Sequence, residues 1–225
     1  MSDAIWLLDA RGVTKRSIVS AEEQLGDASR RVLASLTREA VRRRFLISRA
    51  LLRSAVATWT HGDARDVDIQ ERAGNAPAIR SGSGPVFASL SHTGDWIACA
   101  VDASPIGVDI ERTARARDVV GMSATFFSEA ENAWLLQQRD HTAAFYALWT
   151  GKEAMFKLKQ HVGGDGHLLD THFDIQNGQL CATMPTRRLC YGSISPSLVG
   201  SVARAVEGTS PGASLEWKDA RSLVT

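Results

Sequence analysis

Apolar residues recur every three or four positions in three stretches of the chain, the spacing of a helix that buries one face. The first stretch, Arg38 to Trp59, contains no Gly or Pro. Its apolar face consists of Val41, Phe45, Leu46, Ala50, Leu51, Leu52 and Val56. The other two stretches are Phe126 to Gln138 and Thr142 to Gln160. The pattern therefore predicts two long amphipathic helices, with a further helical segment ahead of the second.

Shorter segments alternate in polarity or run apolar between turn residues, as strands do. The expected strands are Val86 to Ser91, Trp96 to Asp102, Ile106 to Glu111, Phe173 to Met184 around an Asn177-Gly178 turn, Leu189 to Ser195, and Leu198 to Val206. Each long helix is thus followed by strands. We expect an α+β fold of two similar halves, residues 1–104 and 105–225, with a ligand in the cleft between them.

The composition is that of a folded globular protein of 225 residues, with 44% hydrophobic and 23% charged residues. No apolar run is long enough to span a bilayer, and the first residues lack a secretory signal. Three cysteines without C-x-x-C spacing argue against a disulfide framework or a cysteine zinc site. We expect a cytoplasmic protein that does not interact with membranes.

The near-neutral net charge of +1 hides an uneven distribution. Between Arg30 and Arg53 there are eight arginines and one acid, Glu39, a local charge of +7. This stretch either attracts an anion or is a solvated helix face. Nucleic acid is not an expected partner, because the chain as a whole is not basic and few aromatic residues interleave with the arginines.

Two carboxylates share one face of the strand Ile106 to Glu111. Its period of two places Gly107, Asp109 and Glu111 on the same side. The carboxylates could hold a divalent cation such as Mg²⁺, with the glycine leaving room for a ligand to approach the backbone. The alternative is an exposed, solvated pair.

Two further segments carry candidate chemistry. Glu153 and Lys157 lie one helical turn apart, so that a carboxylate and an ammonium face one spot; the alternative is a surface ion pair. The Ser91-His92-Thr93 segment ends a strand at a turn, where hydroxyls, a histidine and backbone amides could converge on a phosphate. The alternative is that the hydroxyls bond to the local backbone of the turn.

Together and in this order, these segments resemble the larger, single-chain 4′-phosphopantetheinyl transferases, the type related to the surfactin synthetase-activating enzyme. The matching motifs are R-R-R-F-L-x-x-R-A-L-L-R from Arg42, S-H-T from Ser91, G-V-D-I-E from Gly107 and W-T-x-K-E-A-x-x-K from Trp149. The resemblance spans roughly residues 30 to 175. It implies a pseudo-dimer of two similar α/β subdomains, with the active site in the cleft between them.

The resemblance also implies a reaction. Phosphopantetheine would pass from coenzyme A to a serine of an apo carrier protein, with Mg²⁺ as cofactor and adenosine 3′,5′-bisphosphate as the other product. The carrier would serve fatty acid, polyketide or nonribosomal peptide synthesis. Because the internal pseudo-symmetry removes the need for a partner subunit, we expect a monomer.

The resemblance also implies roles for individual residues. Asp109, Glu111 and Glu153 correspond to the metal ligands, and Glu153 and Lys157 to the catalytic pair. The residues expected to contact coenzyme A are Arg44, Arg49, Arg72, Asn75, Ser91, His92, Thr93, Asp109 and Lys157. The usual G-K-P motif is replaced by Gly74-Asn75-Ala76-Pro77, so Arg72 or Arg80 would supply its basic contact.

Two other functions remain as alternatives. His161, His167 and His172 interleave with Asp165, Asp170 and Asp174, which could suggest a metallohydrolase, although the spacing matches no standard zinc pattern. A non-catalytic module that binds coenzyme A or a nucleotide is the other alternative. For carrier docking, the candidate is the apolar segment Met122 to Phe127, whose side chains could equally belong to the core.

Overall fold

The chain folds into two compact units, each built from helices and strands, and the fold is α+β as predicted. A computed structural model describes residues 4–72, 75–82, 84–113, 117–163, 168–176, 179–182, 187–205 and 216–224. The first unit comprises residues 1–104 with 216–225, and the second comprises residues 105–215. Within the described ranges, none of the helices combines the length and apolar character that a membrane span requires.

The first unit contains a four-stranded sheet in the order β11-β1-β5-β4. Its elements are β1 (Ala4–Asp9), α1 (Lys15–Glu23), α2 (Asp27–Ser35), α3 (Glu39–Thr60), β2 (Asp68–Gln70), β3 (Ala78–Arg80), β4 (Phe87–Thr93), β5 (Trp96–Asp102) and β11 (Trp217–Asp219). The predicted strands Val86 to Ser91 and Trp96 to Asp102 are confirmed as β4 and β5, which form a hairpin by pairing antiparallel up to Thr93 and Trp96. Gly94 adopts a φ of 57° in the turn between them, a conformation that favours glycine.

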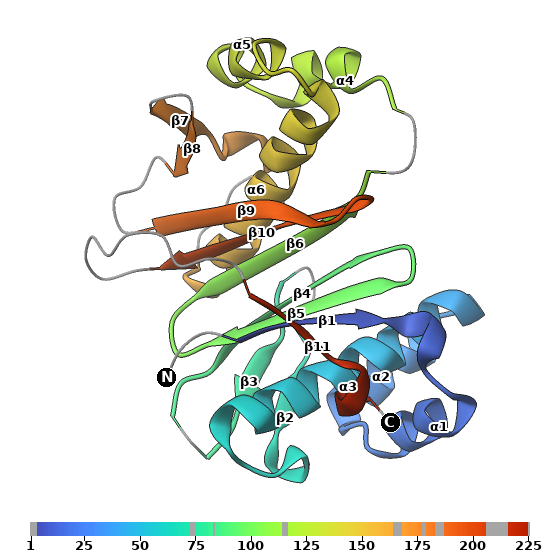
Figure 1. The fold of residues 1–225 in the computed structure, drawn as a ribbon. Coiled ribbons are helices and arrows are strands. Elements are labelled where there is room, and N and C mark those ends of the chain that lie inside the picture. The colour runs from blue at the N-terminus through green and yellow to red at the C-terminus, as the bar shows by residue number, and fades with distance from the viewer. Residues whose placement is uncertain are drawn as a thin grey trace. The chain divides into compact units, whose positions relative to one another are not determined.

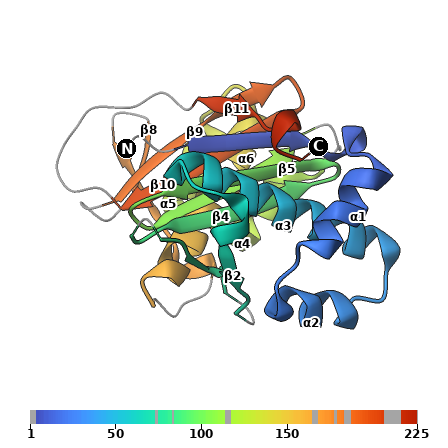
Figure 2. The same ribbon diagram turned by 90° about the horizontal axis from the view of Figure 1, so that it is seen from below.

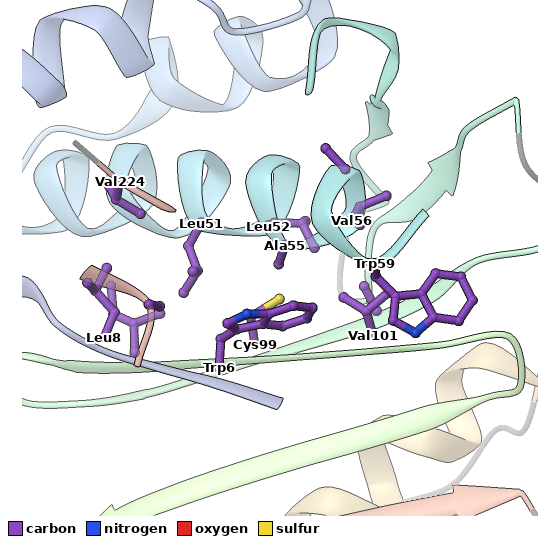
Figure 3. Close-up of a cluster of buried hydrophobic side chains, with 14 of the residues drawn as sticks. Trp6, Leu8, Leu51, Leu52, Ala55, Val56, Trp59, Cys99, Val101 and Val224 are labelled. Atoms are coloured by element: carbon purple, nitrogen blue, oxygen red, sulfur yellow. The ribbon is translucent and has the colours of Figure 1, made fainter. Parts of the chain in front are cut away.

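The predicted helix over Arg38 to Trp59 is confirmed as α3, and it packs on this sheet. Figure 3 shows Leu51, Leu52 and Ala55 on the side of α3 that faces the strands, where Cys99 lies, and Val56 belongs to the same cluster. These five side chains are completely buried. At about 25 cal/mol per Å² of apolar surface removed from water, such a helix face supplies much of the stability of this unit.

A strand near the C-terminus, β11, pairs with the first strand, β1. Strand β11 pairs in parallel with β1, in the register Ile5 to Trp217, and the two strands lie side by side in Figure 2. Val224 joins the same buried cluster as Leu8. The sequence-based division placed residues 216–225 in the second half, whereas this pairing places them in the first unit.

The second unit is a three-stranded antiparallel sheet, β6-β10-β9, with α6 packed along it (Figure 1). Its elements are β6 (Ile106–Arg112), α4 (Val119–Phe126), α5 (Glu129–Leu136), α6 (His141–His161), β7 (Phe173–Gln176), β8 (Gln179–Ala182), β9 (Arg187–Ser195) and β10 (Leu198–Ala205). The predicted helix over Thr142 to Gln160 is confirmed as α6. The predicted strands at Ile106, Leu189 and Leu198 are confirmed as β6, β9 and β10; the Asn177-Gly178 turn between β7 and β8 lies outside the described residues.

The helix predicted from Phe126 to Gln138 is wrong at its start. Phe126 ends α4, and α5 begins only at Glu129. Between them, Ser128 caps α5: its hydroxyl accepts from the Glu131 amide, while the Glu131 side chain accepts from the Ser128 amide. This reciprocal capping box starts a new helix where the apolar spacing alone suggested a continuous one.

Candidate active site

A lysine of α6 and an aspartate of β6 form an ion pair within the second unit. The Lys157 ammonium donates to Asp109 Oδ1 over 2.7 Å and to the Val108 carbonyl over 3.1 Å. Asp109 is only 6% exposed, so it does not belong to a solvated surface pair. Lys157 thus pairs across to the strand and not along its own helix with Glu153.

Glu153 lies one turn before Lys157 on α6 and is partly buried. Burial is the main reason why its pKa is raised above the ordinary glutamate value, and the charge of Asp109 adds to this effect. The Lys157 ammonium lowers the pKa of Glu153, and the Glu111 carboxylate raises it further. Asp109, Glu111 and Lys157 therefore all lie close enough to Glu153 to act on it electrostatically, and Glu153 holds a proton more readily than an exposed glutamate.

This donor set suits a hard divalent cation, since it offers carboxylate oxygens from a strand and a facing helix. The mutual repulsion that raises the pKa of Glu153 is relieved when a cation binds among the carboxylates. Among the described residues, no three His, Cys, Asp or Glu side chains are already gathered closely enough to hold a metal ion. The chemistry of the donors fits a metal, whose binding would draw Asp109, Glu111 and Glu153 closer together.

Gly107 has a different role from the one predicted. A Cβ at this position would lie 1.9 Å from the Ala154 carbonyl oxygen and 2.7 Å from the Leu158 nitrogen, both in the backbone of α6. The missing side chain therefore makes room for the helix and not for a ligand. This close approach lets Glu153 and Lys157 reach the level of Asp109.

A pocket of about 290 Å³ lies in the first unit, between α3 and the β4–β5 hairpin. Its lining residues are Leu36, Val41, Arg44, Phe45, Ser48, Arg49, Leu90, Ser91, His92 and Ile97. Four of the predicted coenzyme A contacts are thus gathered at one place: Arg44, Arg49, Ser91 and His92. Val41 and Phe45, which the apolar pattern assigned to the core face of the helix, line this pocket and are only partly buried.

The two arginines of the pocket differ in their charge balance. Arg49 binds Glu71 through two hydrogen bonds, Nε to Oε1 over 2.6 Å and Nη2 to Oε2 over 2.7 Å. Glu71 also accepts from the Ser29 hydroxyl over 2.7 Å. Arg44 forms no hydrogen bond or ion pair with a described residue, so it contributes an uncompensated positive charge to the pocket.

Several other arginines of the basic stretch donate to main-chain carbonyls. Arg30 donates to Leu25 and Glu23, Arg42 to Leu33 and Leu36, Arg43 to Ala10 and Val13, and Arg53 to Ala64 and Val67. These bonds satisfy carbonyls at helix ends and in loops. Neither sequence interpretation, a solvated face or an anion site, describes these four arginines, which connect elements of the fold.

The other three predicted contacts of the first unit do not line the pocket. Arg72 is exposed and donates to the Ala76 carbonyl over 2.8 Å, and Asn75 is also exposed. Thr93 ends β4 opposite Trp96. Gly74, of the replaced G-K-P motif, lies outside the described residues.

Residues 105–190 match the family model of the 4′-phosphopantetheinyl transferase superfamily. The chain belongs to this superfamily. It is 32% identical to 4′-phosphopantetheinyl transferase Sfp of Bacillus subtilis (strain 168) over 154 residues, 66% of each chain. It is 35% identical over 71 residues to 4′-phosphopantetheinyl transferase gsp of Aneurinibacillus migulanus, 31% of this chain and 29% of that one. With AcpT of Salmonella typhimurium, 32% identity extends over 52% of this chain and 55% of the relative.

The chain thus spans about two thirds of the length of Sfp and a smaller share of the other two relatives. The segment that matches the superfamily model begins just before β6 and includes all of α6. It therefore contains Asp109, Glu111, Glu153 and Lys157. The pocket of the first unit lies outside the segment that the superfamily model matches.

Sequence reasoning missed a buried ion pair within the superfamily segment. Lys152 Nζ lies 2.9 Å from Glu131 Oε2, with side-chain exposures of 1% and 0%. Lys152 also donates to the Thr171 carbonyl, and Glu131 Oε1 accepts from the Phe173 amide over 2.9 Å. The S-x-x-E spacing of Ser128 and Glu131 was the available signal, but it indicates a capping box and gives no hint of the lysine.

The alternative hypothesis of a metallohydrolase named His161, His167 and His172. In the part of the chain that the structure describes, these histidines do not form a metal site. His161 ends α6, and His172 is exposed before β7. His167 lies outside the described residues. No group of three metal-binding side chains forms in the part of the chain that the structure describes.

Proposed function

We propose that the protein transfers the 4′-phosphopantetheine group of coenzyme A to a serine of an apo carrier protein, releasing adenosine 3′,5′-bisphosphate. The observation that carries this proposal is the convergence of Asp109, Glu111, Glu153 and Lys157 inside the segment that matches the superfamily. Relatives that are named 4′-phosphopantetheinyl transferases support the proposal. We also propose that the protein acts as a monomer.

In the proposed reaction, the serine oxygen attacks the phosphorus that carries pantetheine, and the bond to the bridging oxygen of the pyrophosphate breaks. The electron pair of that bond leaves with adenosine 3′,5′-bisphosphate. Glu153 accepts the serine proton, a role that suits a partly buried carboxylate one helical turn from Lys157. The Lys157 ammonium, 2.7 Å from Asp109, donates to phosphate oxygens as charge develops on them.

Asp109, Glu111 and Glu153 would hold Mg²⁺. When bound, the ion supplies positive charge for the pyrophosphate oxygens, which favours phosphoryl transfer. Lys157 would then exchange part of its contact with Asp109 for a contact with the phosphate. Both partners of the present ion pair would thus take part in binding coenzyme A, as the sequence predicted.

The pocket of the first unit would bind phosphate groups of coenzyme A. Arg44 brings an uncompensated charge, and Ser91 and His92 bring polar groups at the end of β4. Arg49 can add hydrogen bonds from its remaining donors, although Glu71 offsets its charge. As part of the proposal, one coenzyme A contacts residues of both units, which form a pseudo-dimer with the ligand in the cleft between them.

The carrier protein would dock near the apolar segment from Met122 to Phe127. Phe127 is buried and belongs to the core. Phe126 is partly exposed and packs edge-on against Trp149, with the ring centroids 5.3 Å apart, and Val120 just before the segment is 42% exposed. Only part of the segment is therefore available to a partner, and Phe126 is the side chain that we assign to docking.

The test is to incubate the purified protein with coenzyme A, MgCl₂ and each of several apo carrier proteins, and to weigh the carriers by intact-mass spectrometry. The proposal predicts one phosphopantetheine adduct on a carrier serine, and none when EDTA replaces MgCl₂. Coenzyme A binding in calorimetry without an adduct on any carrier would instead support a non-catalytic binding module.

A further inference from the structure

A pair of buried hydroxyls includes the cross-strand neighbour of Asp109, and neither residue belongs to the predicted site. Thr150 Oγ1 of α6 and Ser201 Oγ of β10 are 2.6 Å apart, and the two residues are 1% and 0% exposed. Thr150 lies one turn before Glu153 on the helix. Ser201 is the direct cross-strand partner of Asp109 in the pairing of β10 with β6.

The direction of this hydrogen bond follows from a second contact. The Thr150 hydroxyl donates to the Tyr146 carbonyl over 2.7 Å. Because a hydroxyl has a single proton, Thr150 must accept in its contact with Ser201. The proton of Ser201 therefore points toward α6, in the chain Ser201 to Thr150 to Tyr146.

This direction matters because Ser201 has another acceptor within reach. Directly opposed residues of an antiparallel pair have Cβ atoms about 4.5–5.5 Å apart and project from the same face of the sheet. A rotation about χ1 could therefore turn the Ser201 hydroxyl toward the Asp109 carboxylate. A hydroxyl proton on that carboxylate would compete with Lys157, which now donates to Asp109 Oδ1, and with a cation.

We propose that Thr150 is a positioning residue that holds the Ser201 proton away from Asp109, so that this carboxylate serves Lys157 and a divalent cation. The inference rests on the proposed function, because it assigns the cation to the same carboxylates. In this proposal, Thr150 acts by accepting a hydrogen bond through Oγ1, and not only by filling space in the core. Valine has nearly the same shape without that acceptor and therefore separates the two roles.

The test compares Thr150→Val, Thr150→Ser, Ser201→Ala and the double variant Thr150→Val/Ser201→Ala with the unsubstituted protein. The readout is Mn²⁺ and Mg²⁺ affinity by calorimetry, with thermal unfolding as the check on folding. Thr150→Val should weaken metal binding roughly tenfold, the low end of losses for residues that orient metal ligands. Thr150→Ser keeps the acceptor and should bind as the unsubstituted protein does.

The double variant decides between positioning and packing. If Ser201 is the competing donor, removing it should restore metal affinity in the Thr150→Val background. A double variant as weak as Thr150→Val alone, or a Thr150→Val variant with normal affinity, would overturn the inference. Absence of metal binding to the unsubstituted protein would overturn it too, whereas normal metal binding without transfer to any carrier would overturn only the proposed function.

Discussion

Gly107 shows how one missing side chain determines the geometry of the site. Any Cβ there would overlap the backbone of α6, because the Ala154 oxygen is 1.9 Å from the ideal Cβ position. The sequence correctly predicted that Gly107 shares a strand face with Asp109. It could not show that a helix, and not a ligand, occupies the space, because the partner lies almost fifty residues away in the chain.

We predict that Gly107→Ala destabilises the protein by about 3 kcal/mol or more, since a backbone clash cannot be relieved by a side-chain rotation. Urea unfolding measures the change. Gly192→Ala on β9 is the matched control, because a Cβ there meets nothing within 4 Å. The control should stay within about 0.5 kcal/mol, and equal effects at both positions would contradict the packing described.

Glu71 provides a pH-dependent contribution at the residue scale. Burial raises the pKa of Glu71, but the hydrogen bonds and charge of Arg49 and the Ser29 hydroxyl outweigh it, so its net pKa is lowered from 4.5. A carboxyl with a lowered pKa in the folded state stabilises the fold above its unfolded pKa, and this contribution is lost as the pH falls through the folded pKa.

Glu71→Gln should therefore cost about 1–3 kcal/mol at pH 7, and the cost should shrink as the pH is lowered below 4.5. Urea unfolding at several pH values measures it. Glu22→Gln, in the more exposed pair with Arg42 at 3.8 Å, should change stability by less than about 0.5 kcal/mol at any pH. A Glu71→Gln cost that does not change with pH would contradict the assignment.

At the scale of elements, the buried Glu131–Lys152 pair connects the start of α5, the middle of α6 and the segment before β7. Lys152→Met should destabilise the protein by about 3–5 kcal/mol, because it leaves a buried carboxylate without its counter-charge. The double variant Glu131→Gln/Lys152→Met should recover most of this loss, because both partners are then neutral. Chemical unfolding of the unsubstituted protein, Lys152→Met, Glu131→Gln and the double variant measures the coupling.

Lys159→Met is a control on the same helix, since Lys159 donates to the Thr171 hydroxyl and is not completely buried. Its cost should stay below about 1.5 kcal/mol. Purely additive losses in the double variant would show that Glu131 and Lys152 do not act as a pair.

The elements that the sequence predicted well are those with a long internal pattern. Helices α3 and α6 repeat their apolar spacing over five or more turns, and the β4–β5 hairpin has a glycine in its turn. Strand β11 has only three residues, and its pairing with β1 spans the whole chain. Three residues are too few to show a periodic pattern, and a pairing between distant segments leaves no local signal. The sequence analysis therefore did not predict β11.

At the scale of the whole molecule, the uneven charge distribution has a more specific meaning than the sequence suggested. Five of the eight arginines between Arg30 and Arg53 bind main-chain carbonyls or Glu71. The local charge of +7 is therefore not a uniform anion-binding surface. Residue spacing could not separate arginines that connect elements from Arg44, because both kinds occur on the same helix.

We predict that Arg44→Ala weakens coenzyme A binding roughly tenfold or more, the value of a charge-assisted contact to phosphate. Arg38→Ala removes the same charge from the exposed start of α3 and should leave binding almost unchanged. Isothermal titration calorimetry measures both. Equal losses would indicate long-range attraction to the helix and would contradict a local contact in the pocket.

The central claim is that the carboxylates facing Lys157 carry out the transfer. The most direct measurement is the rate of phosphopantetheine addition to an apo carrier, followed by intact mass, for Asp109→Ala, Glu153→Ala and the exposed control Glu129→Ala. The two site variants should transfer at least about a hundredfold more slowly, while their folding is unchanged. Glu129→Ala should transfer at the rate of the unsubstituted protein. Transfer at the unsubstituted rate by either site variant would contradict the account.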